Sequence, residues 1–251
     1  METYKRKKTI YELIFKRFFD FILSLLAIII LSPTFLILII VSKISLGGNP
    51  FFSQYRPGKN GKVFKFFKFR SMTNDVDENG NLLPDEKRIT KFGKFIRKTS
   101  LDELPQLFNI LKGDMSIVGP RPRLVKDMIF YDKDTLMAYA VRPGLTGPSQ
   151  VSGGRSEASW DKIFEADLKY SQKITLWKDI KILFQTVIAV FKSDSSADGS
   201  ASSKREYYYC DYLLKEQKIS KEQYNLGLEM SQAIIQENGI VSYQEELHQK
   251  S

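Results

Sequence analysis

A long apolar segment near the beginning of the chain, interrupted by a proline, narrows the range of folds that the chain can adopt. Residues 18–41 read FFDFILSLLAIIILSPTFLILIIV, with Pro33 close to the middle. A proline inside a helix removes one hydrogen bond, clashes with the carbonyl four residues earlier and disfavours helical geometry at the preceding residue. The segment therefore predicts two apolar helices with a break at Ser32 and Pro33. We expect the hydroxyls of Ser32 and Thr34 to bond carbonyls that the proline frees.

The length and the flanking charges of this segment bear on three possible topologies. A helix from Phe18 to Ser32 spans about 22 Å, which is short of the roughly 30 Å hydrocarbon core of a bilayer. Basic residues flank the segment on both sides, at positions 5–8, 16 and 17 and at 43, 56, 59, 62, 65, 68 and 70. The positive-inside rule then favours both ends on the cytoplasmic side. A re-entrant, monotopic hairpin fits best, and a plain transmembrane span is the alternative. A cleaved signal peptide is disfavoured because no small-x-small site follows.

Scarce residue types exclude several kinds of site. The 251 residues include one histidine, His248, and one cysteine, Cys210. A Ser–His–Asp triad, a multi-histidine zinc site and an internal disulfide are therefore excluded. The net charge of +9 divides into +13 over residues 1–192 and −4 over residues 193–251. Catalysis must then use carboxylates, basic side chains, hydroxyls, backbone amides or a hard metal, and the basic surplus suits anionic lipids and phosphate-bearing substrates.

The remaining pattern predicts an α+β fold that is mostly helical. Residues 51–55 and 63–69 are aromatic runs around an Asn-Gly turn, which is typical of a β-hairpin. We expect its lysines, at positions 59, 62, 65 and 68, to form a solvated or headgroup-facing edge, and residues 75–85 to form a polar loop. Helical patterns follow at 89–98, 104–111, 126–140, 160–170, 174–191, 207–214 and 221–238. The helix that contains Trp177 is either a core helix or an amphipathic interfacial helix.

The densest group of chemically informative residues is the segment 97–123, RKTSLDELPQLFNILKGDMSIVGPRPR. It contains two adjacent carboxylates, Asp102 and Glu103. One interpretation of this pair is structural, because Ser100 and Glu103 have the spacing of a capping box and acidic residues stabilise helix N-termini. Pro105 also fits the first turn of a helix.

The other interpretation is a phosphate-handling site. A helix N-terminus attracts anions, and two carboxylates beside Arg97 and Arg121 are explained if a divalent cation and phosphates meet there. Carboxylate oxygens are natural Mg²⁺ ligands, and a carboxylate can attack phosphorus to give an acyl phosphate. Spacing alone leaves both interpretations open. We expect Asn109, in the same segment, to face solvent or to cap locally.

The segment 100–122, SLDELPQLFNILKGDMSIVGPRP, resembles the signature of the bacterial sugar transferases, the monotopic polyprenyl-phosphate phosphoglycosyl transferases. Further matches are KFRSM at 68–72, RPGLTG at 142–147 and the Ser32-Pro33 break. The resemblance covers roughly residues 14–192. A match of 23 residues with fixed spacing is far more specific than a lone glycine motif.

The resemblance implies an activity and a role for individual residues. The enzyme would transfer a sugar-1-phosphate from a nucleoside diphosphate sugar, usually a UDP-sugar, to undecaprenyl phosphate and release UMP. Asp102 matches the nucleophile that forms a phosphosugar–aspartyl intermediate, and Glu103 matches its partner in placing Mg²⁺ and the phosphates. Residues matched to phosphate or nucleotide contacts are Arg97, Arg121, Arg155, Pro120 and Pro122. The Ser32-Pro33 break matches the re-entrant helix that keeps the fold in one leaflet of the cytoplasmic membrane.

The sequence accordingly divides into four expected regions. Residues 1–46 form the re-entrant membrane helix, 47–192 a catalytic domain that faces the cytoplasm, and 193–203 a Ser-rich linker. Residues 204–251 form an acidic helical extension, in which Ser220 and Gln223 have capping-box spacing. The extension carries no catalytic pattern. We expect it to be an interaction module, for a protein partner or for another copy of the chain, or a partly ordered addition.

Two alternatives lie outside the enzyme class. A membrane-anchored nucleic-acid binder would need a recognised binding motif, and the chain has none, so we expect no nucleic-acid partner. A non-catalytic scaffold for polysaccharide assembly is disfavoured by the intact Asp102 and Glu103. Within enzymes, a hydrolase of nucleotide sugars stays open if water replaces the lipid. The sequence does not identify the sugar or the glycan, which would be capsule, exopolysaccharide, O-antigen or a glycoprotein oligosaccharide.

Overall fold

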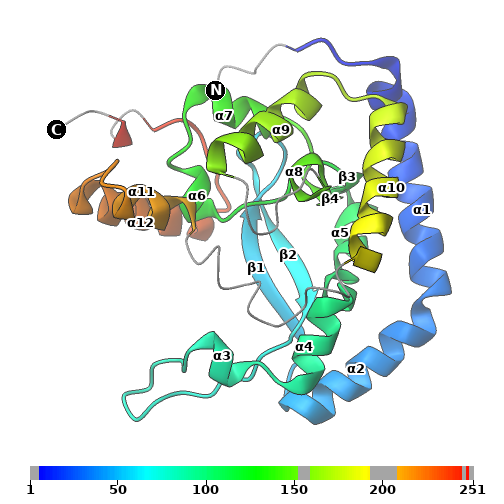
Figure 1. The fold of residues 1–251 in the computed structure, drawn as a ribbon, viewed down its shortest axis with the longest axis vertical. Coiled ribbons are helices and arrows are strands. Elements are labelled where there is room, and N and C mark those ends of the chain that lie inside the picture. Colours follow the sequence, from blue (N-terminus) through cyan, green and yellow to red (C-terminus); the bar gives the residue numbers. More distant parts are fainter. Residues whose placement is uncertain (1–5, 152–158, 193–207, 245–246, 249–251) are drawn as a thin grey trace.

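The computed structural model describes residues 6–151, 159–192, 208–244 and 247–248. The described residues are mostly helical and include two small sheets, which confirms the predicted α+β class (Figure 1). The elements in chain order are η1 (Tyr11–Phe15), α1 (Lys16–Ile30), α2 (Ser32–Leu46), β1 (Phe51–Pro57), η2 (Lys59–Gly61), β2 (Val63–Phe69), α3 (Asp85–Arg88), α4 (Lys91–Lys98), η3 (Leu101–Glu103), α5 (Gln106–Lys112), β3 (Ser116–Val118), α6 (Val125–Met128), α7 (Lys133–Ala138), β4 (Gly144–Thr146), α8 (Pro148–Val151), α9 (Trp160–Gln172), α10 (Leu176–Lys192), α11 (Tyr209–Lys215) and α12 (Lys221–Gln236).

The apolar segment forms two helices that meet at the predicted break. The helical stretches Tyr11–Ile30 and Ser32–Leu46 are bent by 63° relative to each other. Ser32 Oγ donates a hydrogen bond of 2.8 Å to the carbonyl of Ile29, which is the carbonyl that Pro33 leaves without its helical donor. Among the described helices, no single one is both long and apolar enough to cross a membrane. Taken together, the two helices of this bent pair have the required length and hydropathy. The break is therefore confirmed, and a re-entrant course through lipid stays a prediction.

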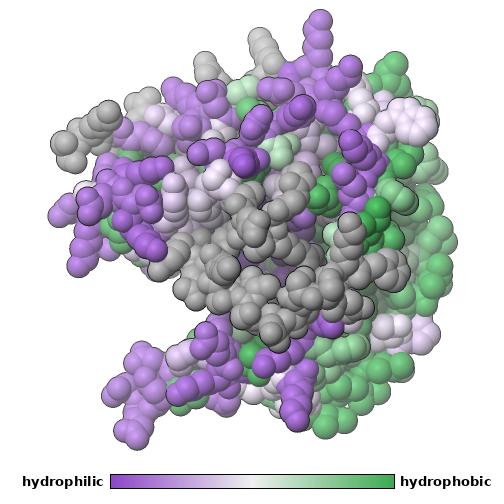
Figure 2. Space-filling view, in the orientation of Figure 1, coloured by the Kyte–Doolittle hydropathy of each residue, from purple (hydrophilic) through white to green (hydrophobic). Residues whose placement is uncertain are grey.

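An apolar surface runs along the outer edge of the molecule. In Figure 1, α1 and α2 form an arc along one side, and Figure 2 shows apolar side chains gathered over that side. Ile30 of α1 is 72% exposed and Ile44 of α2 is 80% exposed. On α10, Trp177 and Phe184 are 79% and 66% exposed, whereas Ile182 on the opposite face is buried. Of the two interpretations of this helix, its outward apolar face favours the interfacial one.

The predicted hairpin is present, and most residues of its second strand are buried. Strands β1 and β2 pair antiparallel from Phe51 opposite Phe69 to Pro57 opposite Val63. The turn η2 contains a residue in left-handed geometry, Asn60, with φ of 56°. A second sheet, which the sequence pattern did not predict, pairs β3 and β4 in parallel. Each of its strands has only three residues, which is too short for an alternating pattern to stand out.

Several helix boundaries differ from the predicted ones for local reasons. The expected helix 126–140 is two short helices, α6 and α7, because Asp132 accepts a hydrogen bond of 2.7 Å from Thr135 N and so begins a new helix. The expected helix 89–98 begins at Lys91, because the Thr90 hydroxyl caps it by accepting from Gly93 N. Ile89 before it is extended.

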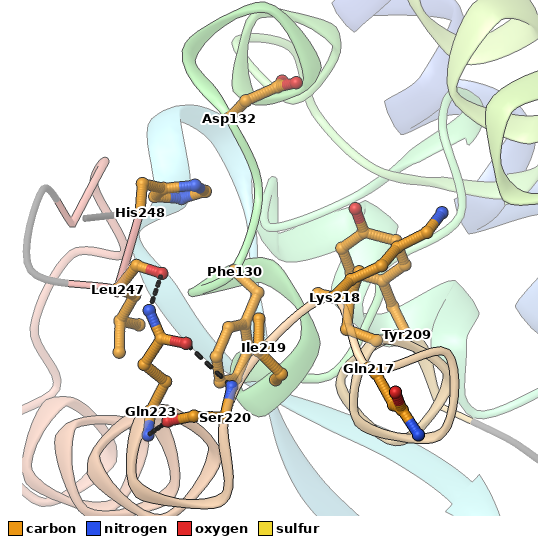
Figure 3. A pocket seen from close by; sticks show the side chains of 11 residues that line it. Phe130, Asp132, Tyr209, Gln217, Lys218, Ile219, Ser220, Gln223, Leu247 and His248 are labelled. Carbon is orange, nitrogen blue, oxygen red and sulfur yellow. Dashed lines mark hydrogen bonds between the residues drawn. The ribbon is translucent and has the colours of Figure 1, made fainter. Parts of the chain in front are cut away.

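The described part of the C-terminal extension packs against the rest of the protein. The predicted capping box of Ser220 and Gln223 is present at the start of α12. Backbone hydrogen bonds join Val63 N to Gly239 O at 3.1 Å and Val241 N to Gly61 O at 2.9 Å. A cavity of about 640 Å³ lies where the extension meets α6 and the residues after it (Figure 3). The expected linker, residues 193–203, lies outside the described residues.

Candidate active site

The two adjacent carboxylates lie on η3, a short turn of 3-10 helix between α4 and α5. Ser100, directly before it, has left-handed backbone geometry with φ of 57°, and its side chain caps no helix. The capping-box interpretation of Ser100 and Glu103 is therefore wrong. The left-handed residue ends α4, and Pro105 then precedes α5 at its N-terminus. This sharp change of direction leaves Asp102 and Glu103 on a turn between two helices.

Lys68 on β2 joins the two carboxylates. Its Nζ lies 3.5 Å from Asp102 Oδ2 and 3.3 Å from Glu103 Oε1. Arg121 donates through Nη2 to the same Glu103 oxygen at 2.9 Å. The side chains of Asp102 and Glu103 are 8% and 15% exposed. The expectation that Lys68 lies on a solvated or headgroup-facing edge is thus wrong, although its place in the KFRSM match was a signal for the site.

The two carboxyl groups have different electrostatic surroundings. Burial on its own would raise the pKa of Glu103, but the charges of Arg121 and Lys68 outweigh it and lower that pKa to about 2. Burial raises the pKa of Asp102 above its ordinary value of 3.8, and Lys68 and then Arg97 only partly oppose this. Glu103 is thus held firmly as an anion between two cations. Asp102 is a less compensated carboxylate, contacted only by Lys68 among the described residues.

Arg97 is near the carboxylates but is held by another residue. It lies on α4, and its Nε donates a hydrogen bond of 2.8 Å to Ser71 Oγ. The helix can lie this close to Ser71 because residue 93 is glycine, and a Cβ there would be 1.8 Å from the Ser71 carbonyl oxygen. Ser71 belongs to the same KFRSM match as Lys68, so one short segment contacts both Arg97 and Asp102.

Asn109 on α5 fixes the position of β2. Its side chain accepts from Phe67 N at 3.2 Å and donates to Lys65 O at 2.8 Å, and the residue is buried. The expectation that Asn109 faces solvent or caps locally is therefore wrong. Because Lys65 and Phe67 come shortly before Lys68 on the same strand, these bonds hold the Lys68 end of β2 beside the turn that bears the carboxylates.

The loop after β3 carries the predicted Pro120, Arg121 and Pro122. Both prolines are buried, and the Pro120 carbonyl accepts from Gly144 N at 2.9 Å. The Pro122 carbonyl accepts from Arg56 Nη1 at 3.4 Å. These contacts show the prolines shaping the loop that presents Arg121.

Arg56 is a cation near this loop that the sequence did not single out. Burial and, after it, the charge of nearby Arg121 together lower the pKa of Arg56 to about 10. Its guanidinium also lies 5.6 Å from the centre of the Phe66 ring. Arg155, which was predicted to contact phosphate, lies outside the described residues.

The donor set around the carboxylates fits a Mg²⁺ ion that is shared with a substrate. Within the described parts of the chain, no group of three or more His, Cys, Asp and Glu side chains is placed to hold a metal. Mg²⁺ is commonly held by one or two carboxylates together with substrate phosphates and water. Asp102 and Glu103 would be two such ligands, since Lys68 Nζ lies within 3.5 Å of an oxygen of each and their negative charges therefore converge on one cation.

Comparison with known proteins gives the family. The model of the bacterial sugar transferase family matches residues 11–193. The uncharacterized sugar transferase EpsL of Bacillus subtilis is 45% identical over 182 residues, which cover 72% of this chain and 90% of EpsL. The UDP-glucose:undecaprenyl-phosphate glucose-1-phosphate transferase of Klebsiella pneumoniae is 41% identical over 196 residues, and the undecaprenyl-phosphate galactose phosphotransferase of Salmonella typhimurium is 41% identical over 199 residues.

The extent of these matches differs between the relatives. The aligned segment makes up 42% of the Klebsiella protein and 41% of the Salmonella protein. The same alignments include 74% and 72% of this chain. The family match includes the two carboxylates, Lys68 and the loop that bears Arg121. The predicted family resemblance is thereby confirmed, and the chain is a transferase enzyme that belongs to the bacterial sugar transferase family.

Proposed function

We propose that the protein transfers a sugar-1-phosphate from a UDP-sugar to undecaprenyl phosphate and releases UMP, which begins the assembly of a lipid-linked glycan. The observation that carries this proposal is the pair Asp102 and Glu103, buried on one turn and neutralised by Lys68 and Arg121. Two relatives are named for transfer to undecaprenyl phosphate, which supports the lipid acceptor. Others are named as exopolysaccharide production proteins, which supports the glycan.

In the first step, an oxygen of the Asp102 carboxylate attacks the β-phosphorus of the nucleotide sugar. The bond from that phosphorus to the bridging oxygen breaks, and UMP leaves with the electron pair. The balance of charges supports Asp102 over Glu103 as this nucleophile. Glu103 already accepts from two cations, whereas Asp102 has one weaker contact, at 3.5 Å, and so keeps a carboxylate oxygen for attack.

In the second step, a phosphate oxygen of undecaprenyl phosphate attacks the phosphorus of the phosphosugar–aspartyl intermediate. The acyl-phosphate bond breaks, the Asp102 carboxylate is regenerated, and the product is a lipid diphosphate sugar. Lys68, Arg97 and Arg121 stabilise the phosphates during both steps, because phosphoryl transfer depends mainly on positioning and on neutralising negative charge. The chemistry needs no imidazole, which agrees with a chain whose one histidine is near its end.

Asp102 and Glu103 would also hold Mg²⁺ with the substrate phosphates. When bound, the ion supplies a positive charge that favours attack on an otherwise anionic diphosphate. Glu103 suits this role because its low pKa keeps it ionised throughout the physiological range.

The acceptor lipid places the site at a membrane surface, and the outer apolar edge of the fold supports this. We infer that α1 and α2 form a re-entrant hairpin with both ends on the cytoplasmic side, and that α10 lies in the headgroup region with Trp177 facing lipid. The 63° bend and the exposed apolar faces of these three helices support a monotopic arrangement at the cytoplasmic membrane.

The decisive experiment is UMP release by the full-length protein in nanodiscs with undecaprenyl phosphate, Mg²⁺ and a panel of UDP-sugars. We expect release with one sugar, loss of release in Asp102→Asn by a factor of about 10³ or more, and loss with EDTA. Asp85→Asn, an exposed carboxylate on α3, is the matched control and should keep full activity. In the absence of acceptor, a donor labelled in the β-phosphate should leave label on the wild-type protein and none on Asp102→Asn. Release with every component present but unaffected by Asp102→Asn would refute the assignment.

A further inference from the structure

A second cavity, of about 300 Å³, lies where the start of the N-terminal helix meets the hairpin turn and β3. It is separate from the two carboxylates, and none of Asp102, Glu103 or Lys68 lines it. Its lining includes five basic and two acidic side chains. The basic residues come from distant parts of the sequence, since Lys8 precedes η1, Lys59 begins the turn after β1, and Arg142 precedes β4.

The two acidic residues in the lining, Glu12 and Asp20, are bonded to groups other than Lys8 and Lys59. Both carboxylate oxygens of Glu12 accept from the guanidinium of Arg6. Asp20 Oδ1 accepts a backbone hydrogen bond of 2.9 Å from Ile117 N. Over the residues that the structure describes, Lys8 and Lys59 form no ion pair with a carboxylate.

Two of the three other basic side chains of the cavity, Arg17 and Arg142, are anchored to backbone carbonyls. Arg17 donates to the carbonyls of Ile110 and Leu111 at 2.5 and 2.8 Å, and Arg142 Nε donates to Gly113 O at 2.8 Å. Both guanidiniums thus cap the C-terminal end of α5. Neither forms an ion pair with a carboxylate of the described residues, although the charges of Asp20 and Asp114 favour the charged form of Arg17. The fifth, Lys16, is paired with Asp179 on α10 at 2.5 Å and is already neutralised.

The surroundings of Lys59 show that these charges converge on a single space. Its pKa is lowered, first by burial and then by the positive charges of Arg142 and Lys8, against a smaller opposing effect of Glu12. Like charges brought this close, and partly out of water, are costly unless an anion joins them. The arrangement therefore has the charge and the concave shape of an anion site, with a volume at the lower end of ordinary ligand pockets.

The neighbouring surface indicates which kind of anion this cavity would bind. Leu13 lines the cavity and is 61% exposed, and Ile14 and Phe18, next along the same helix, are 61% and 59% exposed. These side chains belong to the apolar edge that we propose faces lipid. An anion site that opens beside a lipid-facing helix lies at the depth of the phosphate groups of a bilayer.

We propose that this cavity binds the phosphate group of an anionic lipid headgroup at the membrane surface, as a site separate from the one that holds the transferase substrates. The choice of a lipid as the source of this phosphate group rests on the membrane docking proposed above. The inference that the cavity binds a phosphate group does not rest on that docking. The same cations would accept free phosphate, so the experiment includes both sources. Phosphate is bound by Lys8, Lys59, Arg17 and Arg142 with no covalent step.

The test measures binding by calorimetry with the full-length protein in neutral detergent micelles. The ligands are a short-chain phosphatidylglycerol, the matching phosphatidylcholine and sodium phosphate. The variant Lys8→Gln/Lys59→Gln removes two charges from the cavity. The matched control, Lys62→Gln/Lys65→Gln, removes two charges from exposed lysines nearby on the hairpin that do not line it.

We expect saturable binding of phosphatidylglycerol to the wild-type protein and weaker binding of phosphatidylcholine. Affinity for phosphatidylglycerol should fall about fivefold per lysine removed, or about twenty-five-fold in the cavity variant. The control variant should bind within twofold of wild type. Sodium phosphate binding as tightly as phosphatidylglycerol, and equally sensitive to the cavity variant, would support the site with free phosphate as the source. Absence of binding to the wild type, or an equal loss in both variants, would overturn the inference. The binding measurement does not involve turnover. Its failure would therefore not refute the proposed transferase activity, and failure of the UMP-release assay would not refute this binding site.

Discussion

The ion pair between Arg121 and Glu103 should stabilise the fold in a pH-dependent way. Arg121 Nη2 lies 2.9 Å from Glu103 Oε1, and the pKa of Glu103 is lowered from 4.5 to about 2, with burial opposing the two cations. A carboxyl group whose pKa is lower in the folded state contributes stability above its unfolded pKa and loses it as the pH falls through the folded pKa. The contribution of Glu103 is therefore complete above about pH 4.5 and vanishes near pH 2.

The size of this contribution follows from the same values. A pKa difference from 4.5 to about 2 corresponds to about 3 kcal/mol of folding free energy. Arg121 supplies only part of it, because Lys68 shares the same oxygen and the Arg121 side chain is 35% exposed to screening by water. We therefore expect Arg121→Gln to cost about 1 kcal/mol at pH 7, or a fall in Tm of about 3 °C for a chain of this size.

Thermal unfolding in neutral detergent, followed from pH 7 down to about pH 2, measures this directly. The difference in Tm between Arg121→Gln and wild type should shrink below about pH 4.5 and disappear at the acid end. Lys112→Gln is the control, because its partner Asp114 is 3.3 Å away but the lysine itself is 72% exposed, so the loss should be under about 0.5 kcal/mol. A difference for Arg121→Gln that stays constant from pH 7 to pH 3 would show that ionisation of Glu103 is not its origin.

Three further predictions concern the site and the framework around it. Lys68→Gln removes a charge that lowers the pKa of Asp102, so the acid limb of the pH profile for UMP release should move to higher pH. An acid limb at the wild-type pH would contradict this role of Lys68. Gly93→Ala forces α4 away from a backbone carbonyl and should lower Tm by several degrees despite its better helix propensity, whereas Lys94→Ala should not. Asp179→Ala leaves a buried ammonium unpaired and should cost about 3 to 5 kcal/mol in urea unfolding; wild-type stability would refute this.

The parts of the fold that the sequence predicts correctly are those governed by neighbouring residues. The break at Ser32 and Pro33 follows from one missing N–H group, and the hydrogen bond to Ile29 closes within three residues. The hairpin around Asn60 and the capping box at Ser220 are equally local. For such features the physical cause lies within a few residues and is visible in a single pattern.

The contacts that build the site are not local, which is why the sequence interpretation of them fails. Lys68 and Asp102 are 34 residues apart, and Asn109 reaches a backbone 42 residues away. Spacing also predicted a capping box at Ser100, but the backbone of Ser100 is left-handed where the chain leaves α4, and helix propensity does not reveal this geometry. The family resemblance singled out the two carboxylates together with Arg97 and Arg121, but the contact of Lys68 with both carboxylates became visible only in three dimensions.

The way in which the extension completes the hairpin turn bears on how this enzyme can be engineered. The family match ends at residue 193, yet Val241 lies in the same interior cluster as Val63 and bonds to Gly61. A side chain at position 61 would be 2.1 Å from the Val241 carbonyl oxygen, so turn and tail are fitted to each other. A chimaera that joins the family segment of this chain to the tail of a relative would therefore pack this hairpin turn against a tail whose side chains do not fit it. Such a swap should include the turn together with the tail.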